Sequence, residues 1–454
     1  MKRTWLWLVV GLALGAGLAA AQPADEEAPS VWTDPEFKKR FLGTYGIHSD
    51  VEPKIGPQER AVLEKVSGLL ATDPAAAALA LEAAATPEAT ALFDFVLGNL
   101  AFEDDRTADA EARYLVAVTK LPSFRRAWKN LGLVQMREGR QAEAIGSLTK
   151  AVELGGGDSL TYGLLGQAYA ATGDHLAAES AYRNALLLDP ANTELRLGLA
   201  RSVIRQEKYE EAVALLRVLI EKDQERADLW LLQANAYLGL KQPARAAENL
   251  EIVARMGAAK PETMNLLGDI YVNEGRPDLA ARAYVRAIDL DPAQPAARSL
   301  AAVEALAARG NTLEAEAVAA RAREVFQERM TDAEVQRLLK LQARLDLAAG
   351  KTDDAAQVLG EVIARDPFDG DALMLLGQHY ARAGDPEQAA IYYDQAASLD
   401  AFEARAKLGL AQIRVGQGKY QEALPLLKRA QELKPSDELA RFVDQVERLA
   451  RSQR

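Results

Sequence analysis

Residues 125–192 decide the fold: RRAWKNLGLVQMREGRQAEAIGSLTKAVELGGGD is followed directly by SLTYGLLGQAYAATGDHLAAESAYRNALLLDPAN. The two segments have the same length, 34 residues, and the same order of bulky and small side chains. The positions Trp128, Leu131, Gly132, Ala144, Leu148 and Ala151 recur as Tyr162, Leu165, Gly166, Ala178, Tyr182 and Ala185. The same template returns from Met264 and from Leu373. A fixed period of this length predicts a chain of repeated structural units.

Each unit has the pattern of two short amphipathic helices separated by a turn. Glycine stands at the turn in many units, where a residue with positive φ can end the first helix: Gly173, Gly275, Gly350, Gly384 and Gly418. Proline follows the second helix, which it cannot continue, at Pro190, Pro292, Pro367 and Pro435. One such pair cannot bury its apolar stripe alone, so neighbouring pairs are expected to stack.

These positions resemble the tetratricopeptide repeat (TPR) family, whose units carry a bulky residue, Leu-Gly and Tyr, and then Ala, an aromatic residue, Ala and Pro. The resemblance covers residues 91–437 as about ten units. The units begin near Ala91, Arg125, Ser159, Thr193, Ala227, Pro261, Pro295, Gln336, Gly370 and Ala404. The resemblance implies an all-α TPR solenoid, a right-handed superhelix of helix-turn-helix repeats.

Both ends of the array are expected to be covered. Residues 57–90 are interpreted as a degenerate helix pair and residues 438–454 as a C-terminal capping helix. Residues 22–56 form an N-terminal extension in which Phe37, Phe41 and Tyr45 recur every four residues. This spacing predicts a short helix with an aromatic stripe. The stripe either packs back onto the array or docks on another envelope protein.

The first 21 residues have the pattern of a secretory signal peptide. Lys2 and Arg3 precede an apolar run from Trp5 to Ala21. Cleavage after Ala21 would release a chain to a bacterial periplasm with no stable membrane insertion. The alternative is an uncleaved N-terminal helix that anchors the chain. The chain has no cysteine, which excludes a lipid anchor on that residue.

The composition argues against nucleic-acid binding and against catalysis. Lys and Arg total 54 against 66 Asp and Glu, a formal net charge of -12, which disfavours binding to phosphate backbones. His48, His175 and His379 are far apart in sequence, and no His-x-x-x-His pair occurs. We therefore expect no catalytic residue, no metal site and no cofactor.

Two adjacent carboxylate pairs lie at turns, Asp104-Asp105 and Asp353-Asp354. Paired carboxylates can perform acid–base chemistry, but aspartate at a turn also caps the helix that follows. We interpret both pairs as helix caps.

In such an array the first helix of each unit is expected to build a concave wall that binds partners. The outward-facing residues of this wall would be Phe95, Asn99, Arg126, Lys129, Leu133, Arg137, Arg201, Arg205, Asn235, Asn265, Asp269, Lys340, Arg344, Gln378 and Arg382. Two groups among them are basic: Arg126, Lys129, Arg137, Arg201 and Arg205, and then Lys340, Arg344 and Arg382. They suggest a groove for a segment that carries carboxylates, with ordinary solvated charge as the alternative.

Some TPR proteins bind the C-terminal carboxylate of chaperones through a clamp of Lys and Asn residues. Asn99 and Asn130 match two clamp positions. Phe95 replaces the first lysine, and Leu160 and Leu164 stand in the third unit. We conclude that this clamp is absent.

The function predicted from these patterns is a non-enzymatic scaffold or adaptor for protein–protein interaction in the bacterial cell envelope, accessory to an energised uptake or export assembly. Its partners would be other proteins, either acidic peptide segments or subunits of an envelope complex. The alternative is a glycan- or peptidoglycan-associated binding module.

Overall fold

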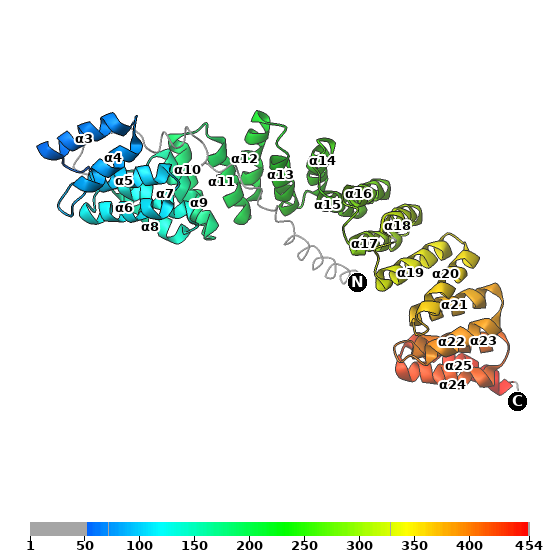
Figure 1. Ribbon diagram of the computed structural model, residues 1–454. Helices are drawn as coiled ribbons and strands as arrows, with labels where there is room; N and C mark the ends of the chain where they lie inside the picture. The colour runs from blue at the N-terminus through cyan, green and yellow to red at the C-terminus, as the bar shows by residue number, and fades with distance from the viewer. Residues whose placement is uncertain (1–51, 71, 327, 453–454) are drawn as a thin grey trace. The chain divides into compact units, whose positions relative to one another are not determined.

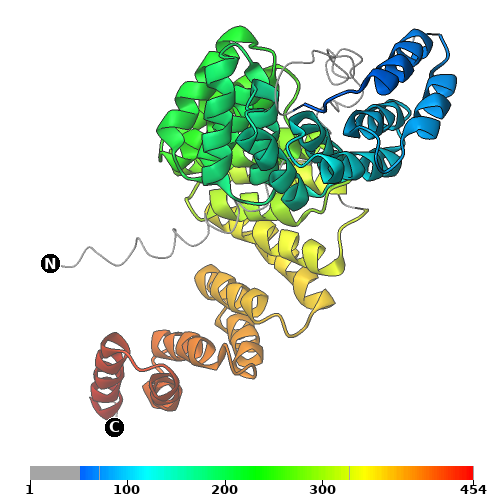
Figure 2. The ribbon, with the colours of Figure 1, turned by 90° about the vertical axis from the view of Figure 1, so that its left-hand side faces the viewer.

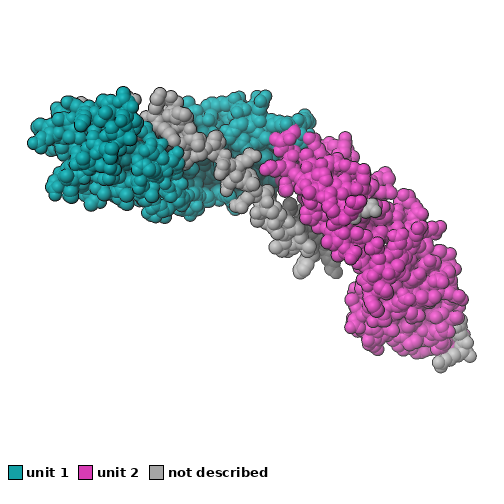
Figure 3. Space-filling model, viewed as in Figure 1, with its two compact units in different colours: residues 1–256 teal, residues 257–454 magenta. Residues whose placement is uncertain are grey.

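The computed structural model describes residues 52–70, 72–326 and 328–452. All regular elements in these residues are α-helices, which confirms the predicted all-α repeat fold (Figure 1). The chain forms two compact units, residues 1–256 and 257–454 (Figure 3). The predicted signal peptide and the aromatic stripe of Phe37, Phe41 and Tyr45 lie outside the described residues. No described helix combines the length and the apolar character that crossing a membrane requires.

The first unit contains α3 to α14, which follow one another as helix pairs; Figure 2 shows the green helices of this unit side by side. Each first helix packs on its own second helix and on the second helix of the preceding pair. The helices are α3 Pro57–Leu70, α4 Pro74–Ala84, α5 Ala91–Glu103, α6 Thr107–Lys120, α7 Arg125–Arg137, α8 Gln141–Glu153, α9 Ser159–Ala171, α10 His175–Leu188, α11 Thr193–Arg205, α12 Tyr209–Lys222, α13 Ala227–Gly239 and α14 Pro243–Arg255.

The second unit continues the same pairing and ends in a single helix, α25. Val446 and Ala450 of α25 are buried, so this helix covers the last pair. The helices are α15 Pro261–Asn273, α16 Pro277–Leu290, α17 Ala297–Ala307, α18 Thr312–Phe326, α19 Asp332–Ala348, α20 Thr352–Arg365, α21 Gly370–Ala383, α22 Pro386–Ala397, α23 Glu403–Gly416, α24 Tyr420–Leu433 and α25 Asp437–Ser452.

Most first helices begin at the residue that the 34-residue period predicts, but α19 begins earlier. It starts at Asp332 instead of Gln336 because Thr331 and Glu334 form a capping box. The Glu334 backbone N–H donates to the Thr331 hydroxyl at 3.3 Å, and the Thr331 N–H donates to the Glu334 carboxylate at 3.0 Å. Local capping therefore overrides the period at this position.

The turns inside the pairs place one residue in the left-handed region of φ. Glycine occupies this position in several pairs, as predicted, and Asp105, Glu207 and Lys241 occupy it in three others. The interpretation of the aspartate pairs as caps is wrong. Asp105 has φ 58°, and the N-cap of α6 is Arg106 without a side-chain cap. Asp353 and Asp354 lie inside the first turn of α20, where the helix dipole favours negative charge.

Close packing of consecutive pairs depends on an aromatic ring held between two glycines. An ideal Cβ on Gly166 would lie 2.8 Å from the ring of Tyr182. An ideal Cβ on Gly198, in the next first helix, would lie 2.5 Å from the same ring. These separations are far below van der Waals contact, so both helices can approach the tyrosine only because they carry glycine there. The bulky and small positions of the repeat are thus complementary in space.

Candidate binding surface on the first helices

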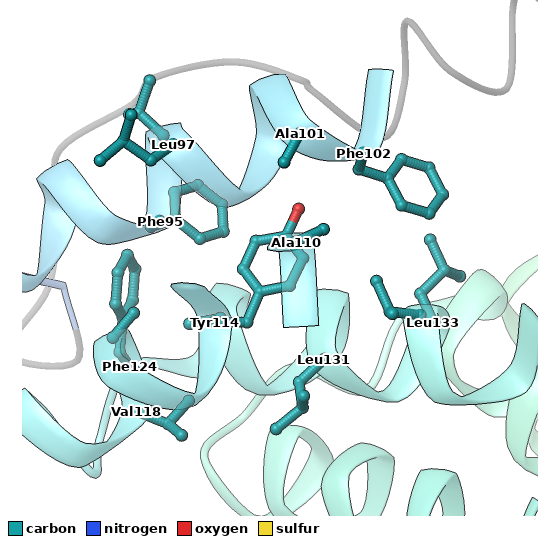
Figure 4. Close-up of a cluster of buried hydrophobic side chains, with 14 of the residues drawn as sticks. Phe95, Leu97, Ala101, Phe102, Ala110, Tyr114, Val118, Phe124, Leu131 and Leu133 are labelled. Atoms are coloured by element: carbon teal, nitrogen blue, oxygen red, sulfur yellow. The ribbon is translucent and has the colours of Figure 1, made fainter. Parts of the chain in front are cut away.

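Four residues predicted to face outward are buried: Phe95, Asn99, Leu133 and Asn265. Helix α5 is buried along its length from Ala91 to Phe102, so it has no outward face. The Phe95 ring lies 5.9 Å from that of Tyr114 and 5.0 Å from that of Phe124 (Figure 4). The prediction of an exposed wall is therefore wrong at these four positions, where the side chains belong to the core.

The two asparagines that match the chaperone-clamp positions form an internal network. The Tyr114 hydroxyl donates to Asn99 Oδ1 at 2.8 Å, and Asn130 Nδ2 donates to the same oxygen at 3.0 Å. Asn99 is 1% exposed and Asn130 is 4% exposed. These amides hold α5, α6 and α7 together and present no clamp to a ligand.

Arg126 lies on α7 and is paired with a carboxylate from the segment that precedes α3. Its Nε donates to both carboxylate oxygens of Glu52, at 3.1 and 2.9 Å, and its Nη2 donates to Oε2 at 2.7 Å. The guanidinium also lies over the rings of Phe95 and Phe124, 5.2 and 5.7 Å from their centroids. The positive charge of Arg126 is thus neutralised by the chain itself.

Three more cations of the predicted wall have carboxylate partners within the chain. Lys129 Nζ lies 2.6 Å from Asp158, Arg137 Nη2 lies 2.9 Å from Asp105, and Lys340 Nζ lies 2.8 Å from Asp369. Burial alone would raise the pKa of Asp158, but Lys129 and the hydrogen bonds from Thr161 hold it below its usual value. These pairs join each first helix to the turn before or after it, so they stabilise the stack.

Four arginines of the wall are exposed and make no hydrogen bond or ion pair with any described residue: Arg201, Arg205, Arg344 and Arg382. Asn235 on α13 is also exposed, while Gln378 on α21 is half-buried. Asp269 accepts a hydrogen bond from the Tyr284 hydroxyl at 2.7 Å and pairs with Arg298. The polar surface that remains open to a partner in the first unit is therefore centred on α11 and α13.

Each unit has a hollow at the junction of one pair with the next first helix. The larger, about 310 Å³, lies between α9, α10 and α11 and is lined by Ala170, Ala171, Gly173, His175, Arg201, Ser202 and Arg205. The smaller, about 140 Å³, lies in the second unit and is lined by Leu347, Thr352, Leu375, Gln378, His379, Arg382 and Ala383.

The two hollows occupy corresponding positions of their repeats. Arg205 and Arg382 stand at the same place in the last turn of α11 and α21, and Arg201 corresponds to Gln378. The sequence pattern identified these four residues. It missed His175, because a residue at the turn of one unit reaches the next first helix only in three dimensions.

Metal binding has no support in the described part of the chain, where no three His, Asp or Glu side chains gather closely enough to hold an ion. The surface offers arginine, histidine and amide donors, which suit hydrogen bonding to anionic or polar groups.

Comparison with known proteins was made for sequence and for structure. A tetratricopeptide repeat profile matches residues 95–159, 231–295, 265–333, 340–404 and 392–438, and a second tetratricopeptide repeat profile matches residues 169–236. The Hsp70-Hsp90 organizing protein of Triticum aestivum is 32% identical over 103 residues, which is 23% of this chain and 18% of that protein.

Two solved bacterial structures are similar. A tetratricopeptide repeat protein from Parabacteroides merdae has 19% identity and a TM-score of 0.36 over 52% of this chain and 94% of its own. The pilF protein of Pseudomonas aeruginosa has 22% identity and a TM-score of 0.34 over 45% of this chain and 92% of its own.

Proposed function

Because the chain belongs to the tetratricopeptide repeat family, we propose that it is a non-enzymatic scaffold that binds other proteins along the exposed part of its first helices. The observation that carries the proposal is the contrast along this surface. Arg126, Lys129 and Arg137 are paired within the chain, whereas Arg201 and Arg205 are exposed and have no described partner. A surface that only needed solubility would have no reason to differ in this way.

We place this scaffold in the bacterial cell envelope, as an accessory to an energised uptake or export assembly. The support is the sequence of the first 21 residues, in which Lys2 and Arg3 precede an apolar run. Release of the full-length chain by osmotic shock of intact cells tests the location. Retention in the membrane fraction would favour the uncleaved anchor, and retention in the cytoplasm would contradict the proposal.

Site-specific photo-cross-linking in cells tests the binding surface. A photoreactive phenylalanine at Asn235 or at Arg205 should yield an adduct with another protein. The same group at Arg217, which is exposed on the second helix α12, is the matched control and should yield none. Adducts from Arg217 alone, or from no position, would contradict binding along the first helices. Recovery of cell-wall sacculi instead of proteins would favour the glycan-binding alternative.

A further inference from the structure

The hollow between α9, α10 and α11 concentrates positive charge in an acidic protein. Arg201 and Arg205 are four residues apart on α11, so they lie on the same face of the helix and repel each other. The chain as a whole carries 66 acidic and 54 basic residues. Two adjacent cations without a counter-charge are unfavourable in the empty protein, and a bound anion would remove this cost.

The nearest carboxylate of α10 cannot supply the counter-charge, because it is already occupied. Glu179 is 9% exposed and accepts hydrogen bonds from Arg183 at 2.8 Å, Lys208 at 2.6 Å and Gln206 at 2.8 Å. Its two oxygens therefore have three donors. The arginines of α11 remain open to a group from outside the chain.

The third polar group of the hollow is His175, at the start of α10. Its Nδ1 is buried and has no hydrogen-bond partner among the described residues. Its backbone carbonyl accepts a hydrogen bond from Gln206 Nε2 at 3.0 Å, which joins the turn to α11. A buried ring nitrogen without a partner is costly, and in the Nδ1–H tautomer it can donate to an acceptor in the hollow.

The geometry points to a site for the side-chain carboxylate of an acidic, extended partner segment, bound by Arg201 and Arg205 with His175 as a further donor. Guanidinium groups match the two oxygens of a carboxylate, which makes this ligand the best fit to the donors present. The inference rests on the proposed function, because it names the chemistry of the partner. The smaller hollow of the second unit has Gln378 in place of Arg201 and is expected to bind such a group more weakly.

A labelled peptide tests this site directly. The probe is Gly-Ser-Glu-Ser-Glu-Ser-Gly with an uncharged dye at the N-terminus and an amidated C-terminus, so that its only carboxylates are side chains. Its counterpart carries Gln for Glu. Fluorescence anisotropy with the full chain at low ionic strength gives the two dissociation constants. We expect the Glu peptide to bind at least about tenfold more tightly than the Gln peptide.

Charge-matched variants localise the binding. Arg201→Glu and Arg205→Glu should each weaken binding of the Glu peptide at least about tenfold, and His175→Ala should weaken it less. Arg217→Glu changes the net charge equally but lies on α12 outside the hollow, so it should leave the constant within about twofold. Circular dichroism melting of each variant checks that the fold is retained.

Equal affinity for the Glu and Gln peptides would overturn the proposed site, as would an equal loss in Arg217→Glu and Arg205→Glu. If the site fails in this way while Asn235 still cross-links to a protein in cells, the scaffold function stands without it. If the peptide binds as expected but no first-helix position cross-links, the site stands and the scaffold function is contradicted.

Discussion

Glu52 and Arg126 are 74 positions apart in sequence and are joined by three hydrogen bonds of 2.7 to 3.1 Å. Glu52 is 7% exposed, and the guanidinium that holds it lies over Phe95 and Phe124. The segment before α3 is thus fastened to α7 by its own carboxylate. The pair also shows how this surface binds a carboxylate: a planar guanidinium, supported by aromatic rings, contacts both oxygens.

Replacing Glu52 by Gln should destabilise this region by about 1–3 kcal/mol, because it removes the charge and leaves Arg126 partly buried without a counter-charge. Hydrogen exchange of the α5 and α7 amides measures the local loss, since repeat proteins open locally. Asp109→Asn is the control: it breaks the exposed Arg106–Asp109 pair and should cost less than about 1 kcal/mol. Equal protection in the two variants would show that the Glu52 pair contributes nothing special.

Gly166 and Gly146 should respond in opposite directions to the same substitution. Gly166→Ala places a methyl group 2.8 Å from the Tyr182 ring and should destabilise the protein by about 1–3 kcal/mol. Gly146 lies inside α8 with no atom within 4 Å of its ideal Cβ, so Gly146→Ala should stabilise the helix by about 0.5–1 kcal/mol. Urea midpoints followed by circular dichroism measure both changes. A shift in the same direction would contradict the packing argument.

Lys241 stands where most turns have glycine, with φ 58°. Lys241→Gly should relieve backbone strain and raise the stability by up to about 1 kcal/mol, after the entropy of the unfolded glycine is subtracted. Gly275→Ala, at φ 70° and with no atom within 4 Å of the Cβ, should lower it by about 1 kcal/mol through the backbone alone. Thermal melts compare the two. A destabilised Lys241→Gly would mean that the lysine side chain contributes more than its backbone costs.

Acid should weaken the contact between α10 and α12 through Glu179. Burial alone would raise the pKa of this carboxyl, but hydrogen bonds from Lys208, Arg183 and Gln206 lower it from 4.5 to about 2. Because the folded pKa lies below the unfolded one, the stabilisation is complete above about pH 4.5 and is lost as the pH falls towards 2.

The measurement is the difference in unfolding free energy between the wild type and Glu179→Gln as a function of pH. This difference should be constant from neutral pH down to about 5 and should shrink below it. Lys208→Met removes the strongest lowering contact and should move the decline to higher pH. A difference that does not change with pH would rule out Glu179 as the source.

Much of the fold could be predicted because its determinants are local. The start of α7 at Arg125 and of α15 at Pro261 follows from the period, and the turn at Gly173 follows from the conformational freedom of glycine. The early start of α19 was also encoded locally, in Thr331 and Glu334, but the period obscured it. The burial of Phe95 could not be predicted in this way, because it depends on contacts with Tyr114 and Phe124 from two other helices.

Sequence alone specified the helical pairs, their turns and the residue types along the first helices, since each depends on neighbours within one repeat. Tertiary structure decided which of those side chains are available. Arg126 and Arg201 look alike in the pattern, yet Glu52 neutralises the first and nothing described neutralises the second. The physical reason is that an ion pair forms over a few ångströms of space, and only the stacking of different repeats determines which charges come that close.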